Sequence, residues 1–132
     1  MLAARHITLE TAEAFLTPTL KNHLPDPFHL KDMDKAANRL VYAITTGEPV
    51  AVFGDYDVDG ATSSALLVRF FAMLGHTLRV YIPDRITEGY GPNLPALLQL
   101  REEGISLVVT VDCGTASLEP IQAAREAGLE TI

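Results

Sequence analysis

Three aspartates stand at alternate positions in the stretch VAVFGDYDVDGATSSALL, which covers residues 50–67. Asp55, Asp57 and Asp59 follow an apolar run directly and precede a segment with helical character. Carboxylates at this spacing repel one another unless a cation or hydrogen-bond donors offset their charge. The stretch therefore predicts a site that holds a cation.

Two other interpretations fit the aspartates less well. A turn rich in Asp and Gly explains one aspartate well, but it explains three at alternate positions poorly. A calcium loop of the EF-hand type also opens with D-x-D-x-D-G. Counted from Asp55, however, its twelfth position is Leu66, where a bidentate glutamate belongs. The segment before Asp55 also has the pattern of a strand rather than a helix, so the EF-hand is disfavoured.

A fourth aspartate, Asp112, directly follows the apolar run LVVTV at residues 107–111. Ligands of open α/β sheets bind beyond the carboxyl ends of the strands. If segments 50–53 and 107–111 are neighbouring strands, Asp112 faces the first cluster and can bridge two metals about 3.5–4 Å apart. Oxygen ligands of this kind favour Mg²⁺ or Mn²⁺ over Zn²⁺. Taken alone, Asp112 has the simpler interpretation of an acid that caps a turn.

Two further segments carry groups suited to a phosphate. The first is DGATSS, which opens a predicted helix and carries the hydroxyls of Thr62, Ser63 and Ser64. An anion is favoured at a helix N-terminus. Ser and Thr also cap many helices, so this signal is weak by itself.

The loop YIPDRITEGYGPN, residues 81–93, offers Arg85 for a phosphate, Tyr90 for stacking and Gly91 for close backbone approach. Arg85 can instead pair with Asp84 or Glu88, and Tyr90 can simply pack.

The elements that position these residues follow from the pattern after Pro49. Short apolar runs at 50–53, 78–82 and 107–111 alternate with helix-length segments at 61–74, 94–103 and 117–127. This alternation predicts repeated βαβ units, hence an α/β fold with a parallel sheet and flanking helices. Segments 50–53 and 107–111 lack polar alternation, which indicates strands covered on both faces. The last four residues, LETI, have the pattern of a fourth strand as it begins.

The first 48 residues are predicted to be a helical lead-in. Segment 8–16 is a short amphipathic candidate, and segment 26–47 carries apolar residues at helical spacing before Gly47 ends it. The domain prediction is a helical N-terminal lead-in over 1–48 and an α/β domain over 49–132.

Composition and charge set outer bounds on function. A chain of 132 residues with 48% apolar residues can bury a core, and its single cysteine excludes an intrachain disulfide. No apolar run is long enough for a membrane span and no secretory signal is visible, so the expectation is a soluble, cytoplasmic protein. The net charge of −7 argues against a nucleic-acid partner, but two bound divalent ions would reduce it to −3, so charge decides little.

The histidines and the cysteine fall outside the predicted chemistry. His6, His23, His29 and His76 lie away from the three loops and are interpreted as surface or packing residues. Cys113 adjoins the site, but without an activating histidine it is interpreted as a small buried residue.

Three motifs in order, GDYDVDGATSSALL, YIPDRITEGYG and VTVDCGT, together with LPDPFHLKDMDKAANRL before them, carry a family resemblance. From about residue 24 onward the chain resembles the N-terminal part of the RecJ family of bacterial single-strand DNA exonucleases, within the DHH phosphoesterase superfamily. The resemblance implies a 5′-to-3′ exonuclease of single-stranded DNA that acts in recombination and repair. It also implies two Mn²⁺ or Mg²⁺ ions that activate water, and it suggests a single-strand binding protein and a helicase as partners.

The resemblance also assigns roles to individual residues. Asp57, Asp59 and Asp112 match catalytic metal ligands, and Asp55 matches an additional acid in the motif. Arg85 matches an arginine expected near the 5′ phosphate of the substrate. Phe53 stands where other branches of the superfamily often have a histidine. How much Asp55 contributes to metal binding is therefore left open.

Some family features are absent from the 132 residues. The Asp-His-His motif, the last metal-binding aspartate and the second domain do not occur, so the resemblance implies a fragment that is inactive by itself. Two alternatives stay open: a small-substrate phosphoesterase, such as an oligoribonuclease, a pyrophosphatase or a cyclic-dinucleotide hydrolase, and a non-catalytic scaffold. YIPDRITEGYG favours the exonuclease, and the intact acids disfavour the scaffold.

Overall fold

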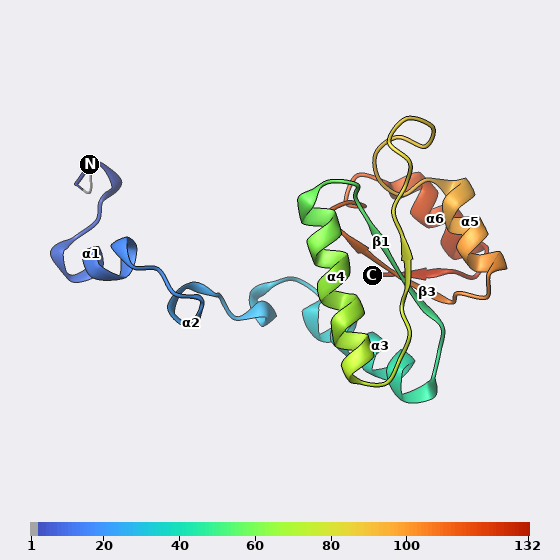
Figure 1. Ribbon diagram of the computed structural model, residues 1–132, viewed down its shortest axis with the longest axis horizontal. Coiled ribbons are helices and arrows are strands. Elements are labelled where there is room, and N and C mark those ends of the chain that lie inside the picture. Colours follow the sequence, from blue (N-terminus) through green and yellow to red (C-terminus); the bar gives the residue numbers. More distant parts are fainter. Residues whose placement is uncertain (1–2) are drawn as a thin grey trace. The chain divides into compact units, whose positions relative to one another are not determined.

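The computed structural model describes residues 3–132 and divides them into two compact units, one up to Lys35 and one from Ala36 to Ile132 (Figure 1). The elements run in the order η1 (Ala3–Arg5), α1 (Leu9–Leu16), α2 (Leu20–His23), η2 (Pro27–His29), α3 (Met33–Thr46), β1 (Val50–Gly54), α4 (Val58–Met73), β2 (Arg79–Tyr81), α5 (Leu94–Glu102), β3 (Leu107–Val111), α6 (Leu118–Glu126) and β4 (Glu130–Thr131).

The four strands form one parallel sheet in the order β2-β1-β3-β4. The predicted α/β fold with a parallel sheet and flanking helices is confirmed. The LETI segment supplies β4, in which Glu130 pairs with Leu107 of β3. The predicted neighbours, β1 and β3, pair along their whole length, from Val50 with Leu107 to Gly54 with Val111.

Helices cover both faces of the sheet (Figure 1). On one face, Val50 and Val52 of β1 pack with Ala43 of α3 and Phe71 of α4. On the other face, alternate β1 residues such as Phe53 pack with residues of α5 and α6. All five residues of β1 are buried, as the unbroken apolar pattern predicted. The central strands are thereby fixed between two apolar layers.

The helical lead-in is present, but its second segment begins later than predicted. Residues 26–32 do not join the helix, because the Asp26 side chain accepts a hydrogen bond from the Phe28 amide and caps the short η2 turn instead. Asp32 then adopts a left-handed φ of 60°, which an α-helix does not accommodate. The long helix α3 therefore starts at Met33, and it ends at Thr46 before Gly47, whose φ is 70°.

The longest described helix, α4, has 16 residues. Among residues 3–132, no helix combines the length and the apolar character that crossing a membrane requires.

Candidate metal centre

Two loops at the carboxyl ends of β1 and β3 bring the predicted aspartates together. Asp55 follows Gly54 and Asp112 follows Val111, and these two strand residues are partners in the sheet register. Because parallel strands end at the same edge, the acids after them converge. Carboxylate oxygens of Asp55, Asp57 and Asp112 all lie within 4.8 Å of one another.

Asp55 is the buried member of this cluster, with 3% of its surface exposed. Its carboxylate accepts a hydrogen bond of 2.8 Å from the Tyr56 amide. Gly60, in the first turn of α4, packs directly against it, since a Cβ at Gly60 would lie 2.3 Å from the Asp55 carbonyl oxygen. Because only glycine permits so close an approach, Gly60 allows the first turn of α4 to pack directly against the Asp55 backbone.

Asp57 is the N-cap of α4. Its Oδ1 atom accepts hydrogen bonds from the amides of Asp59 (3.0 Å) and Gly60 (3.2 Å). These bonds hold the carboxylate at the start of the helix, where a negative charge is favoured. Asp57 therefore serves the local structure and the cluster at the same time.

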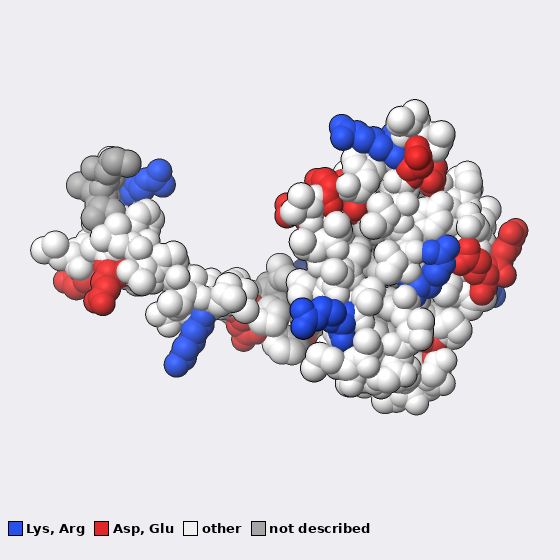
Figure 2. All heavy atoms as spheres, in the orientation of Figure 1, with Lys and Arg blue, Asp and Glu red and all other residues white. Residues whose placement is uncertain are grey.

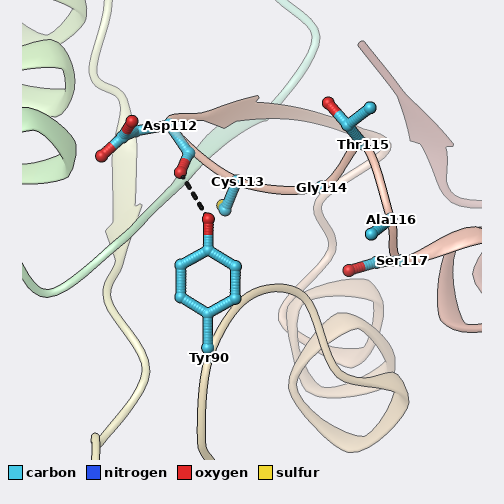
Figure 3. Close-up of a pocket in the computed structure, with 7 residues that line it drawn as sticks. All are labelled: Tyr90, Asp112, Cys113, Gly114, Thr115, Ala116 and Ser117. Carbon is cyan, nitrogen blue, oxygen red and sulfur yellow. Dashed lines mark hydrogen bonds between the residues drawn. The ribbon is translucent and has the colours of Figure 1, made fainter.

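Asp112 lies in a strained turn that accepts a hydrogen bond from the neighbouring loop. Its φ is 58°, a left-handed value that is uncommon outside glycine and that recurs at functional sites. Figure 3 shows the Tyr90 hydroxyl donating to the Asp112 carbonyl oxygen at 3.0 Å, while the Asp112 carboxylate points away from Thr115 and Ser117. Desolvation and the negative charge of Asp57 raise the pKa of the Asp112 carboxyl.

The donor set suits a hard divalent cation. All three side chains offer carboxylate oxygens, the ligands that Mg²⁺ and Mn²⁺ prefer. In the described part of the chain, no ion pair includes any of the three. Figure 2 shows acidic side chains gathered where α4 begins and a basic side chain projecting beside the loop after β2. The uncompensated charge at this edge fits a bound cation.

Asp59, the remaining predicted aspartate, lies outside the three-carboxylate cluster. Asp59 is exposed in the first turn of α4, where its amide donates to Asp57. Its role as a metal ligand stays a prediction.

Helix α4 begins at Val58, three residues earlier than predicted, so Ser63 and Ser64 occupy its second turn. Ser64 is 3% exposed, and its Oγ atom has no hydrogen-bond partner among the described residues. A Cβ added at Gly54 would lie 2.3 Å from this oxygen, which places Ser64 directly over the end of β1. Contact of Ser63 or Ser64 with substrate stays a prediction.

The loop between β2 and α5 brings Arg85 beside the aspartate loop. The Arg85 guanidinium lies 5.1 Å from the centre of the Tyr56 ring, a cation–π contact with the residue between Asp55 and Asp57. Arg85 makes no ion pair with Asp84 or Glu88 within residues 3–132. The guanidinium therefore stays available to an anion at the site.

An open pocket of about 630 Å³ lies next to the cluster, lined by Tyr90, Asp112, Cys113, Gly114, Thr115, Ala116 and Ser117 (Figure 3). Tyr90 is 65% exposed, and Gly91 beside it has a φ of 77° and approaches Ser117. Burial and the nearby Asp55 charge raise the pKa of Cys113 to about 11, so its thiol is a weak nucleophile at neutral pH.

Sequence reasoning missed two residues of this region. Tyr56 supports Arg85, and Glu88 binds three donors of the loop. A tyrosine between two clustered aspartates was the only signal for the first. Nothing local to Glu88 shows that its partners come from β2 and from the start of α5.

Comparisons with known proteins identify similar chains. The family model described as "DHH family, N-terminal domain" matches residues 49–132. The chain is 42% identical over 125 residues to the single-stranded-DNA-specific exonuclease RecJ of Bacillus subtilis, covering 95% of this chain and 16% of that protein. The RecJ of Haemophilus influenzae is 37% identical over 130 residues, covering 98% of this chain and 22% of the relative.

Solved structures agree. A crystal structure of exonuclease RecJ bound to manganese aligns with a TM-score of 0.70 at 38% identity, over 77% of this chain and 26% of the other. RecJ from Thermus thermophilus in complex with Mn²⁺ aligns with a TM-score of 0.63 at 33% identity, over 77% of this chain and 14% of the other. The chain thus spans about a fifth of the length of the two curated relatives named above.

Proposed function

The chain belongs to the DHH family, and from this premise we propose that it forms the catalytic edge of a metal-dependent nuclease that degrades single-stranded DNA from 5′ to 3′. The convergence of Asp55, Asp57 and Asp112 at the ends of two paired strands carries the proposal. Similar proteins named as single-stranded-DNA-specific exonucleases support the choice of substrate.

Asp55, Asp57 and Asp112 would hold the metal, with Asp59 as a further candidate ligand. The proposed ions are two of Mn²⁺ or Mg²⁺, supported by the all-oxygen donor set and by the manganese-bound structures of similar proteins. When bound, such ions activate water and stabilise charge on the leaving oxygen of a phosphodiester. We propose that further ligands lie outside these 132 residues, so the isolated chain should bind Mn²⁺ weakly and hydrolyse no DNA.

The residues around the cluster provide for substrate binding. Arg85 stands free of acidic partners in the described structure and would bind a phosphate through its planar guanidinium. Tyr90 is exposed beside the pocket, where its ring face would stack on a base, and Gly91 would allow close backbone approach. A role in recombination and repair, and a single-strand binding protein and a helicase as partners, belong to the same proposal and rest on the motif resemblance to the RecJ family. A cytoplasmic location is proposed with them.

The test uses the full-length gene product with single-stranded and double-stranded DNA, short oligonucleotides and pyrophosphate, each in Mn²⁺, Mg²⁺, Ca²⁺ or EDTA. We expect digestion of single-stranded DNA in Mn²⁺, with the 5′ label released first, and loss of digestion in Asp112→Asn. Turnover of only short oligonucleotides or pyrophosphate would indicate a small-substrate phosphoesterase. DNA binding without hydrolysis would indicate a scaffold.

A further inference from the structure

Glu88 joins both ends of the loop that connects β2 to α5. One carboxylate oxygen accepts from the Asp84 amide at 2.9 Å, at the start of the loop. The other accepts from the Tyr81 hydroxyl of β2 at 2.8 Å and from the Asn93 side-chain amide at 3.3 Å. Asn93 in turn caps α5 by accepting from the Ala96 amide. The single Glu88 side chain thus contacts the strand, the loop and the helix cap.

The segment between these anchors is ordered by its own hydrogen bonds. The Asp84 carboxylate accepts from the amides of Ile86 and Thr87, both at 2.9 Å, and from the Thr87 hydroxyl at 3.1 Å. The amides of Glu88 and Gly89 donate to the Asp84 carbonyl. These hydrogen bonds order the loop internally, and Glu88 joins it to the sheet through Tyr81.

The same loop contacts both halves of the aspartate cluster. Arg85 lies on Tyr56 in the loop after β1, and the Tyr90 hydroxyl binds the Asp112 carbonyl in the loop after β3. Arg85 and Tyr90 stand three residues before and two residues after Glu88 in the sequence. A displacement of Glu88 would move both of them.

We propose that Glu88 is a positioning residue, which sets the β2–α5 loop across the metal centre so that Arg85 and Tyr90 stand ready for substrate. The inference rests on the proposed function, because its substrate is single-stranded DNA. Glu88 itself is unsuited to bind that substrate, since its charge repels phosphate and its oxygens are occupied by three donors. Glu88 therefore affects substrate binding only through Arg85 and Tyr90, which the loop carries.

The test compares Glu88→Ala and Glu88→Gln in the full-length gene product. Preorganisation of a binding group lowers the cost of binding, so Glu88→Ala should raise KM for single-stranded DNA about tenfold. The kcat and the Mn²⁺ affinity should change less than about twofold, because the aspartates stay in place. Glu88→Gln keeps one acceptor and should show an intermediate KM. Glu102→Ala, at an exposed glutamate of α5, is the matched control.

A double-mutant cycle separates positioning from a general structural role. If Glu88 acts mainly through Arg85, Glu88→Ala should raise KM less than about threefold further in an Arg85→Ala protein. Hydrogen exchange should also quicken at the Ile86 and Thr87 amides and stay unchanged in β1 and β3. An unchanged KM in Glu88→Ala, or full additivity with both Arg85→Ala and Tyr90→Ala, would overturn the inference.

The role of Glu88 can still be tested if the protein digests no DNA. A wild-type protein that digests none of the DNA substrates would contradict the proposed function and leave no substrate for positioning. Hydrogen exchange in Glu88→Ala would still decide whether Glu88 holds the loop, since that measurement needs neither metal nor DNA. Unchanged exchange there would overturn the inference by itself.

Discussion

Acidic side chains gather at both ends of the strands. The acids at the amino edge are paired with an arginine, whereas the acids at the carboxyl edge are not. At the amino edge, Arg39 of α3 donates to both Glu48 oxygens at 2.7 and 2.8 Å and to Glu130 at 2.6 Å. Ser106 adds a hydrogen bond of 2.6 Å to Glu48. At the carboxyl edge, Asp55, Asp57 and Asp112 have no such cation among the described residues.

The pKa directions follow the same division. The hydrogen bond from Arg39 lowers the pKa of Glu48, whereas desolvation and neighbouring aspartates raise the pKa of Asp112. Folding stability explains the first arrangement, because each acid is satisfied within the protein. The same reason does not account for the acids at the carboxyl edge, because no ion pair among the described residues offsets their charge. The acids at the amino edge are thus paired within the protein, whereas the acids at the carboxyl edge are the ones proposed to hold a metal.

The largest expected effect comes from Asp57. Asn at this position can still accept the Asp59 and Gly60 amides, so Asp57→Asn removes the charge and keeps the helix cap. We expect nuclease activity of the full-length protein to fall at least about 100-fold in saturating Mn²⁺, because a metal ligand is lost. The free energy of unfolding without metal should stay the same or rise, since repulsion at the cluster falls.

Two variants complete that measurement. Asp57→Ala should lose the same activity and also about 1 kcal/mol of stability, because the cap is lost as well. Asp34→Asn, at an exposed aspartate in the first turn of α3, should change neither quantity. Near-normal digestion by Asp57→Asn would contradict the assignment of the carboxyl edge to metal binding.

Arg39→Ala should have the largest effect on stability. The Arg39 side chain is 20% exposed and the Glu48 side chain 18%, so the variant leaves the Glu48 carboxylate poorly solvated and without its cation, whereas Glu130 is 61% exposed and stays solvated. We expect a loss of about 2 kcal/mol in denaturant unfolding, with Mn²⁺ affinity unchanged. Arg39→Lys should restore only part of this, because lysine lacks the planar fork. A loss of metal binding with intact stability would reverse the roles assigned to the two edges.

Arg85→Ala tests the basic residue that lies on the Tyr56 ring at the carboxyl edge. Loss of a charged hydrogen-bond pair with a terminal phosphate should weaken binding of 5′-phosphorylated single-stranded DNA by about 2 kcal/mol. DNA with a 5′ hydroxyl should lose less. Arg125→Ala, in the last turn of α6, is the matched control. An equal loss on both DNA ends, measured by fluorescence anisotropy, would indicate a contact other than the terminal phosphate.

The smallest expected effect is the pH dependence of the amino edge. Because the pKa of Glu48 is lowered in the folded protein, its contribution to stability is present above the unfolded pKa and is lost as pH falls through the folded pKa. Glu48→Gln should therefore cost about 1 kcal/mol at pH 7 and progressively less below about pH 4.5. Glu119→Gln on α6 provides the control. If the stability loss in Glu48→Gln did not depend on pH, the charge of Glu48 would not contribute to folding stability.

The sequence predicted the parts of the molecule that depend on local pattern. Apolar runs located the central strands, and the rule that ligands lie beyond parallel strand ends anticipated that Asp112 would meet Asp55. The amino-edge contacts were beyond prediction, because Arg39 and Glu130 are joined only by the packed fold. The left-handed turn at Asp112 was also missed, since its hydrogen bond comes from Tyr90 in a different loop.

The pairing of β1 with β3 also has a kinetic consequence. Val50 and Leu107 are partners although about 57 residues separate them, and closing so long a stretch of chain costs entropy before any contact forms. Such non-local pairing slows folding, whereas helices form locally and early. Asp55 and Asp112 become neighbours only with this pairing. In refolding experiments, the recovery of Mn²⁺ binding should therefore lag behind the recovery of helical circular dichroism.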